Sequence, residues 1–375
     1  MFRPFLALAA FFLVPTGAAS AGDESGLRPQ HFAYPPLVLE DMGPALKPEV
    51  QPAPVIDRSR AYLLDIAEDE FSAKPERVVR NVWDRIRNGF AMEPLRGPLV
   101  AERELWYSQR KDLVANISQK SRRYLFHIVE EVEKRGLPME LALLPFVESG
   151  FEPGALSTAQ AAGLWQFIPG TAQRYRLKLN DHYDARRDIV ASTGAALDYL
   201  EFLHGIFNDW QLALAAYNWG EEAVLRAVQR NQAKGLPTDY ESLTVPEETR
   251  YYVPKLMAIR NIVLSPELHG VELADIPNAP YFTGIDVPMA LDLQSVARLS
   301  GLPASEVLAL NPSHKSSFIS GKGKPALLLP ADRIEAFAQK IADYPVKTGG
   351  TRKRDTGKAM QKSVVGFDIP AAKPL

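Results

Sequence analysis

The sequence predicts a mainly α-helical protein with a small α+β module towards its C-terminus. Apolar residues recur every three or four positions over residues 75–90 and again over 118–134, which is typical of amphipathic helices. Strand signals are scarce between residues 136 and 264, where Ala and Leu are frequent. After Pro277 the pattern changes, and the apolar run 326–329 indicates a strand.

The composition is that of a globular protein with two or three domains. The chain has 375 residues, 46% of them hydrophobic, and a net charge of -2, so it can bury a sizeable core. The balanced charge gives no reason to expect a nucleic-acid partner. Because the chain has no Cys and only 6 scattered His, we expect neither disulfides nor a metal site, and we expect no cofactor.

The first 21 residues have the three-part layout of a secretory signal peptide. Arg3 precedes an apolar stretch over residues 5–14, and the small residues 19–21 offer a cleavage site. The alternative is an uncleaved membrane anchor, but the apolar part is short for a span. We therefore expect export to the periplasm and no transmembrane span after cleavage of residues 1–21.

The rest of the chain divides by composition. A Pro-rich linker is expected over 22–58, because its seven prolines oppose both helix and central strand. A helical N-terminal region over 59–135 precedes a compact helical domain over 136–265. We expect the α+β module over 280–335 and a disordered basic tail over 346–375.

The helical domain contains one proline in an informative place. The helix that starts after Pro138 contains Pro145, which should kink it just before Glu148. Further along the chain, apolar spacing predicts four more helices, over residues 189–207, 210–217, 221–230 and 247–263.

Glu148 is the candidate catalytic residue, because it ends an apolar run and is followed by Ser149 and Gly150. A carboxyl group at the edge of an apolar helix is desolvated, so it holds its proton more tightly. Such a group can donate a proton to a leaving oxygen near neutral pH. The alternative is a structural carboxylate that caps a turn or pairs with a surface base.

Four short motifs occur in order around this residue. They are Glu148–Ser149, the Gly-Leu-Trp-Gln run 163–166, the Ala-Tyr-Asn run 216–218, and Glu-Thr-Arg at 248–250 followed by Tyr252. Each is weak alone, but the ordered set is specific. In this combination the chain resembles lytic transglycosylases with the soluble-transglycosylase catalytic domain, and most of all the membrane-bound lytic murein transglycosylase D group.

The resemblance implies a lysozyme-like helical catalytic domain and a lyase that acts on the glycan strands of peptidoglycan in the cell wall. The bond cut would be the β-1,4 link between N-acetylmuramic acid and N-acetylglucosamine. Glu148 would act first as acid and then as base while the muramic C6 hydroxyl closes a 1,6-anhydro ring. The alternatives are a hydrolytic lysozyme-like muramidase and a non-catalytic glycan-binding protein of the same fold. The nearest alternatives for a second carboxyl group are Asp181, Asp184 and Glu152.

The resemblance also implies a substrate-binding set around the acid. Tyr217 would lie beside Glu148, and Tyr252 would close the site from the far side. Relatives often have Gly at the position of Gln160, so the resemblance does not determine the shape of this loop. Trp165 is either a groove residue or a core residue. The expected substrate-binding residues are Ser149, Gly163, Gln166, Tyr217, Asn218 and Tyr252, with a backbone-bonded hydroxyl as the alternative for Ser149 and a helix stop as the alternative for Asn218.

Residues 285–330 resemble a degenerate LysM-like repeat. Helical patterns over 292–299 and 304–310 precede the strand signal over 326–329, whereas the usual first strand is poor. Glycan binding by this module and a structural lid on the catalytic domain both remain open.

Overall fold

A computed structural model of the protein describes residues 79, 81–287, 289–316, 318–320, 326–344 and 364–365. The expected signal peptide and Pro-rich linker lie outside the described residues, as does the expected basic tail apart from residues 364–365. No helix within the described part of the chain is long and apolar enough to cross a membrane.

The described chain begins with four helices. Asn81 starts the first of them with a capping box, in which its side chain accepts from the backbone N–H of Asp84 at 3.1 Å. Of the helix expected over 75–90, only this part is described. The four are α2 (Val82–Asn88), α3 (Pro98–Ser108), α4 (Lys111–Ser121) and α5 (Leu125–Lys134).

The single helix expected over 118–134 is wrong, because the chain turns between α4 and α5. The buried Ser121 hydroxyl donates to the carbonyl oxygen of Ser118 at 2.7 Å, and the N–H of Tyr124 donates to the carbonyl oxygen of Ser121 at 2.8 Å. Serine hydroxyls that bond nearby backbone compete with helix continuation. The apolar spacing nevertheless survives the turn, since Tyr124 and Leu125 are both buried.

Pro145 starts a helix and does not kink one, so that expectation is also wrong. The 3-10 helix η2 (Met139–Leu143) is followed by the separate helix α6 (Leu144–Glu148), in which Pro145 is the second residue. Proline is tolerated there because N–H groups in a first turn have no intrahelical partner. Glu148 is therefore the last residue of a helix only five residues long.

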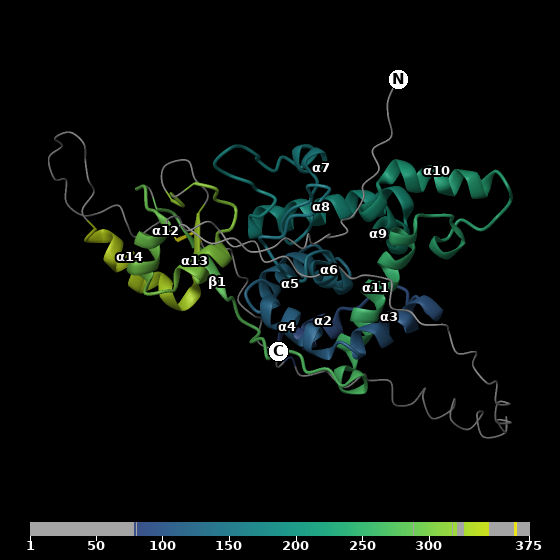
Figure 1. The fold of residues 1–375 in the computed structure, drawn as a ribbon, viewed down its shortest axis with the longest axis horizontal. Coiled ribbons are helices and arrows are strands. Elements are labelled where there is room, and N and C mark those ends of the chain that lie inside the picture. The colour runs from purple at the N-terminus through teal and green to yellow at the C-terminus, as the bar shows by residue number, and fades with distance from the viewer. Residues whose placement is uncertain are drawn as a thin grey trace, which may run out of the picture. The chain divides into compact units, whose positions relative to one another are not determined.

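Longer helices follow, and the sequence predicted four of them to within two residues at each end. Asp188 and Asp209 start two of these by accepting from a backbone N–H three residues on. The helix Glu247–Leu264 packs against α3, η2, α6 and the helix Trp210–Trp219 (Figure 1). Its buried side chains belong to one core that also contains side chains of α2 to α5 and of the helix Ile189–Phe207. The bounds are α7 (Pro169–Arg174), α8 (Ile189–Phe207), α9 (Trp210–Trp219), α10 (Glu221–Gln232) and α11 (Glu247–Leu264), with the 3-10 helices η3 (Tyr240–Ser242) and η4 (Pro266–His269).

The C-terminal module is a small α+β unit with its own core. Strand β1 pairs antiparallel with β2, and the two-residue strand β3 pairs with β1 on its other edge. Buried Val296, Val307 and Phe337 belong to the core beneath this sheet. The first strand, which looked poor in the sequence, is thus present. The elements are β1 (Phe282–Ile285), α12 (Leu293–Ser300), α13 (Ala304–Leu310), β2 (Leu327–Pro330), η5 (Ala331–Arg333), α14 (Ile334–Ala342) and β3 (Val364–Val365).

Polar contacts join the module to the helical region. The Arg123 guanidinium donates to both carboxylate oxygens of Glu306 on α13 at 2.7–3.1 Å, and Tyr281 donates to the same carboxylate at 2.7 Å. The Tyr124 hydroxyl donates to the carbonyl oxygen of Ala309 at 3.0 Å. A two-pronged Arg–carboxylate contact fixes geometry as well as charge, so this edge of the module is well defined.

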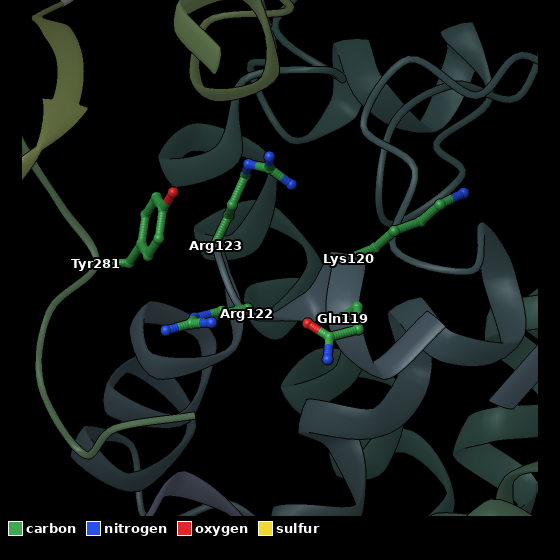
Figure 2. Close-up of a pocket in the computed structure, with 5 residues that line it drawn as sticks. All are labelled: Gln119, Lys120, Arg122, Arg123 and Tyr281. Carbon is green, nitrogen blue, oxygen red and sulfur yellow. The ribbon is translucent and has the colours of Figure 1, made fainter. Parts of the chain in front are cut away.

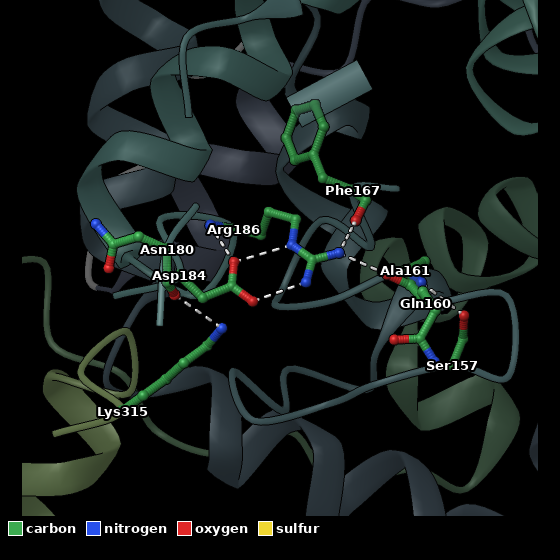
Figure 3. A network of polar contacts seen from close by, with 8 residues as sticks. All are labelled: Ser157, Gln160, Ala161, Phe167, Asn180, Asp184, Arg186 and Lys315. Carbon is green, nitrogen blue, oxygen red and sulfur yellow. Dashed lines mark hydrogen bonds and ion pairs between the residues drawn. The ribbon is translucent and has the colours of Figure 1, made fainter. Parts of the chain in front are cut away.

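A buried ion pair fixes the long loop between α6 and α7 (Figure 3). Arg186 donates to the Asp184 carboxylate at 2.9 and 2.7 Å, and both residues are buried. The same guanidinium donates to the carbonyl oxygens of Gln160 at 2.5 Å and Phe167 at 3.2 Å. Burial raises the pKa of Asp184, but hydrogen bonds and charge from Arg186 outweigh it and hold that pKa below its usual range. Asp184 is therefore an ionised structural residue.

We expect Arg186→Met to destabilise the protein by about 3–5 kcal/mol, because it leaves the Asp184 carboxylate buried without its partner. The double variant Asp184→Asn with Arg186→Met should recover part of that loss. Urea unfolding followed by tryptophan fluorescence measures both. The control is Arg226→Met, since the Arg226 side chain is 55% exposed and should change stability by less than about 0.5 kcal/mol. An Arg186→Met effect no larger than that of the control would contradict this account.

Candidate active site

Glu148 combines partial exposure with a strongly perturbed carboxyl group. It ends α6, keeps part of its surface in solvent, and accepts a hydrogen bond from the Tyr252 hydroxyl on α11. Burial raises the pKa of Glu148 to about 7, while the Tyr252 hydrogen bond lowers it and the nearby charge of Glu248 raises it. A carboxyl with this pKa populates both protonation states at neutral pH, as an acid that later serves as a base requires.

Two tyrosines face this carboxyl group. Burial, followed by the charge of Glu148, raises the pKa of both Tyr217 and Tyr252 well above the usual range. Both phenols therefore stay protonated and serve as donors. The Tyr217 hydroxyl donates to the carbonyl oxygen of Trp165 at 2.9 Å, while the Tyr252 hydroxyl donates to Glu148 itself. These are the two expected site residues that lie with the acid.

The loop after α6 is tied to the end of that helix. The Ser149 hydroxyl donates to the carbonyl oxygen of Leu164 at 2.9 Å, and the Gln166 amide donates to the carbonyl oxygen of Gly163 at 2.9 Å. Trp165 is fully buried and donates its indole N–H to Thr193 at 3.0 Å, so it is a core residue. The roles of Ser149 and Gln166 towards a sugar remain predictions, since both side chains already bond the protein.

Gly163 has a structural reason to be glycine. Its φ of +85° is strained for other residues, and a Cβ there would lie 1.9 Å from the carbonyl oxygen of Arg186. The close approach is thus between two protein segments, and the sugar contact expected for Gly163 stays a prediction. Gln160 in the same loop also has a positive φ, +64°, which explains why glycine suits that position.

Asn218 links the end of α9 to the start of α11. Its side-chain oxygen accepts from the Thr249 hydroxyl at 2.8 Å, and its amide nitrogen lies 3.5 Å from a Glu248 oxygen. Burial holds the pKa of Lys255 below its usual range, although the charges of Glu248 and Glu148 act to raise it. The expected sugar contact of Asn218 stays a prediction. Its amide contacts Glu248, the residue whose charge raises the pKa of Glu148.

The sequence analysis included Glu248 only as part of a motif, without a role at the site, and it did not identify Lys255. They share a helix face with Tyr252, at the i, i+4 and i+7 positions of α11, and this spacing was visible in the sequence. Of the carboxyl groups that the sequence offered as a second catalytic group, Asp184 pairs with Arg186, Glu152 contacts Lys120 at 3.4 Å, and Asp181 is exposed. None of these three contributes to the pKa shift of Glu148.

Among the described residues, no group of three or more His, Asp or Glu side chains gathers in a way that could hold a metal ion. The groups that act on the Glu148 carboxyl, or on which it acts, include the phenols of Tyr217 and Tyr252, the carboxyl group of Glu248 and the amine of Lys255.

We expect Glu148→Gln to raise the free energy of unfolding at pH 8 by up to about 3 kcal/mol and to change it little at pH 4. The folded-state pKa is raised, so the parent loses stability as pH rises from the unfolded-state value towards 7, and neutral Gln avoids this cost. Urea unfolding at both pH values measures the effect. The exposed Glu93→Gln is the control; equal shifts for both variants at pH 8 would contradict the buried-acid account.

Comparison with known protein families places two domains in the chain. Residues 127–238 match the family model "Transglycosylase SLT domain", and residues 281–345 match "Lytic transglycosylase MltD, LysM-like domain". These matches agree with the family resemblance found in the sequence motifs.

The chain is also similar to individual proteins. The membrane-bound lytic murein transglycosylase D of Escherichia coli K12 is 35% identical over 263 residues, which are 70% of this chain and 58% of that protein. The membrane-bound lytic murein transglycosylase C of Mannheimia succiniciproducens is 28% identical over 193 residues, 46% of this chain and 52% of that protein. A solved structure of the lytic transglycosylase Slt from Pseudomonas aeruginosa matches 39% of this chain and 24% of that one at 24% identity, with a TM-score of only 0.29.

The chain spans just over half the length of these curated relatives. The first matching region contains Glu148, and the described part of the second includes the elements from β1 to α14. The chain therefore carries a soluble-type lytic transglycosylase domain followed by a LysM-like domain of the lytic transglycosylase D type.

Proposed function

We propose that the protein is a peptidoglycan lytic transglycosylase that cleaves the β-1,4 bond between N-acetylmuramic acid and N-acetylglucosamine. The observation that carries the proposal is Glu148: a partly exposed residue inside a matched transglycosylase domain, with a carboxyl group whose burial raises its pKa to about 7. Such a group can give a proton to a leaving sugar oxygen and take one back in the same turnover.

In the proposed reaction Glu148 protonates the glycosidic oxygen as the bond from that oxygen to the muramic anomeric carbon breaks. The C6 hydroxyl oxygen of the same muramic residue then bonds to that carbon, and its proton passes to the Glu148 carboxylate. One proton is lent and returned, and no water is added. Because the attack is intramolecular, correct positioning of the sugar replaces much of what a second carboxyl group does in hydrolytic glycosidases.

The neighbouring residues have defined parts in this proposal. Tyr252 stabilises the carboxylate that remains after proton donation, and Tyr217 holds the loop beside the acid through its hydrogen bond to the Trp165 carbonyl oxygen. The amide oxygen of Gln166 has no hydrogen bond among the described residues, so it is the group of that side chain best able to meet a sugar donor. Asn218 acts through Glu248.

The site of action that we propose is the periplasm, with peptidoglycan as the partner. The LysM-like domain would add contacts to the same polymer. The location is supported by the proposed substrate and by the signal-peptide layout of residues 1–21, which lie outside the described residues.

Glu248 gives the hydrolytic alternative a specific basis. Its charge acts on Glu148, so a second carboxylate is present near the acid, as in glycosidases that activate water. The mass of the product separates the two reactions, because a 1,6-anhydro end lacks the mass of one water. Glu248→Gln should leave anhydro products unchanged in kind if Glu248 only tunes the acid.

Purified protein incubated with intact sacculi should release muropeptides with anhydro ends, measured by mass spectrometry. Glu148→Gln should lower the rate of release by at least about a hundredfold, because no proton can be donated. Its folded state, followed by circular dichroism, should be retained. Release of hydrated ends alone would favour the muramidase, and full activity of Glu148→Gln would exclude the proposed role of this residue.

Tyr252→Phe should move the alkaline limb of the pH profile of kcat/KM to higher pH. The Tyr252 hydrogen bond lowers the pKa of Glu148, so its removal raises that pKa and keeps the acid protonated further into the alkaline range. The control is Tyr251→Phe, because Tyr251 lies over Arg103 and is not among the groups that shift Glu148. An unchanged or acid-shifted limb in Tyr252→Phe would show that the hydrogen bond does not set the proton affinity.

A further inference from the structure

The structure contains a recess of about 500 Å³ that is lined by none of the residues around Glu148 described above. Its walls come from the end of α4 and the turn after it, with Tyr281 on the opposite side (Figure 2). None of the lining side chains is acidic or aliphatic. We call it the basic recess; it is lined by Gln119, Lys120, Arg122, Arg123 and Tyr281.

The cations of the basic recess are neutralised to different degrees. Arg123 is fully engaged by Glu306. Lys120 meets Glu152 at 3.4 Å with side chains 29% and 42% exposed, and so exposed a pair stabilises little. Arg122 is exposed and makes no ion pair with any residue that the structure describes. The recess therefore keeps net positive charge, and a ligand carboxylate could take the place of Glu152 on Lys120.

The basic recess adjoins the segment that follows the acid. Glu152, which Lys120 contacts, is four residues after Glu148. A Cβ at Gly150 would lie 3.5 Å from the side chain of Ile117, one turn before Lys120 on α4. The basic recess therefore lies against the segment that directly follows the acid, within a few residues of Glu148 along the chain.

We propose that the basic recess binds the carboxylates of the peptide stems carried by the peptidoglycan strand, an inference that rests on the proposed function. The stem is an acidic peptide covalently joined to the muramic sugar. Arg122 and Lys120 supply charge-assisted donors to its carboxylates, and Gln119 supplies an amide for its backbone. The recess thereby favours strands that still carry stems over bare glycan.

Basic residues also stabilise the C-terminus of any helix through its dipole, and α4 ends here. That role predicts a small loss of stability on substitution and no dependence on the substrate. Binding of stems predicts the reverse: unchanged stability, and an effect confined to substrates with stems.

The test compares two substrates and two variants. Glycan strands with their stems, and the same strands stripped of stems by an amidase, are cleaved by the parent, by Lys120→Gln with Arg122→Gln, and by the control Arg226→Gln on α10. We expect the double variant to lose about tenfold in kcat/KM on stem-bearing strands, the loss expected for charge-assisted hydrogen bonds. On stripped strands it should stay within about twofold of the parent. Its thermal unfolding should match that of the control.

The outcomes separate the two proposals. Equal losses on both substrates, or no loss on either, would overturn the stem-binding role while the parent still produces anhydro ends. A loss on stem-bearing strands that Arg226→Gln shares would overturn it as well, because general charge would then explain the effect. A parent that produces no anhydro ends from either substrate overturns the proposed function and this inference together.

Discussion

The burial of the Glu148 carboxyl is the constraint on which the arrangement of the helical region depends. It lies at the end of a helix of five residues, which is far too short to be stable alone. The buried side chains of Leu144 and Phe146 anchor that helix in the shared core, and α11 packs against it. Burial raises the proton affinity of the acid and destabilises its ionised form, so the surrounding core must offset a cost that the proposed chemistry requires.

The loop between α6 and α7 shows the same relation between strain and support. Three non-glycine residues of this loop, Phe151, Gln160 and Gln166, have positive φ, a conformation that persists only where the surroundings enforce it. Arg186 provides that enforcement through two backbone carbonyls and its buried pair with Asp184. The backbone N–H of Asp184 also donates to the carbonyl oxygen of Ser313, which follows α13 in the LysM-like domain, at 2.8 Å. The loop next to the acid is thus supported from the module as well.

Features encoded locally could be predicted from the sequence, and those that depend on distant partners could not. The helix 189–207 has an Asp cap and regular apolar spacing, so its ends were predictable. Pro145 fits either a kink or a first turn, and only the packing of η2 decides between them. Strand β1 is short and contains Gly284; it exists because it pairs with a strand more than forty residues away. Glu148 was predictable because its motif is local, whereas the influence of Glu248 requires knowing where α11 lies.

That placement of α11 explains how one carboxyl group could serve twice. A carboxyl group that donates a proton and then accepts one needs a pKa near the working pH. With a much lower pKa it would be ionised before it could donate, and with a much higher pKa it would be a poor proton donor to the leaving oxygen. Burial raises the pKa of Glu148, and the charge of Glu248 raises it further. The hydrogen bond from Tyr252 and the charge of Lys255 lower it. The last three groups share one face of α11. The helix therefore supplies groups that raise the proton affinity of the acid and groups that lower it, so the packing of α11 against α6 sets the balance between them.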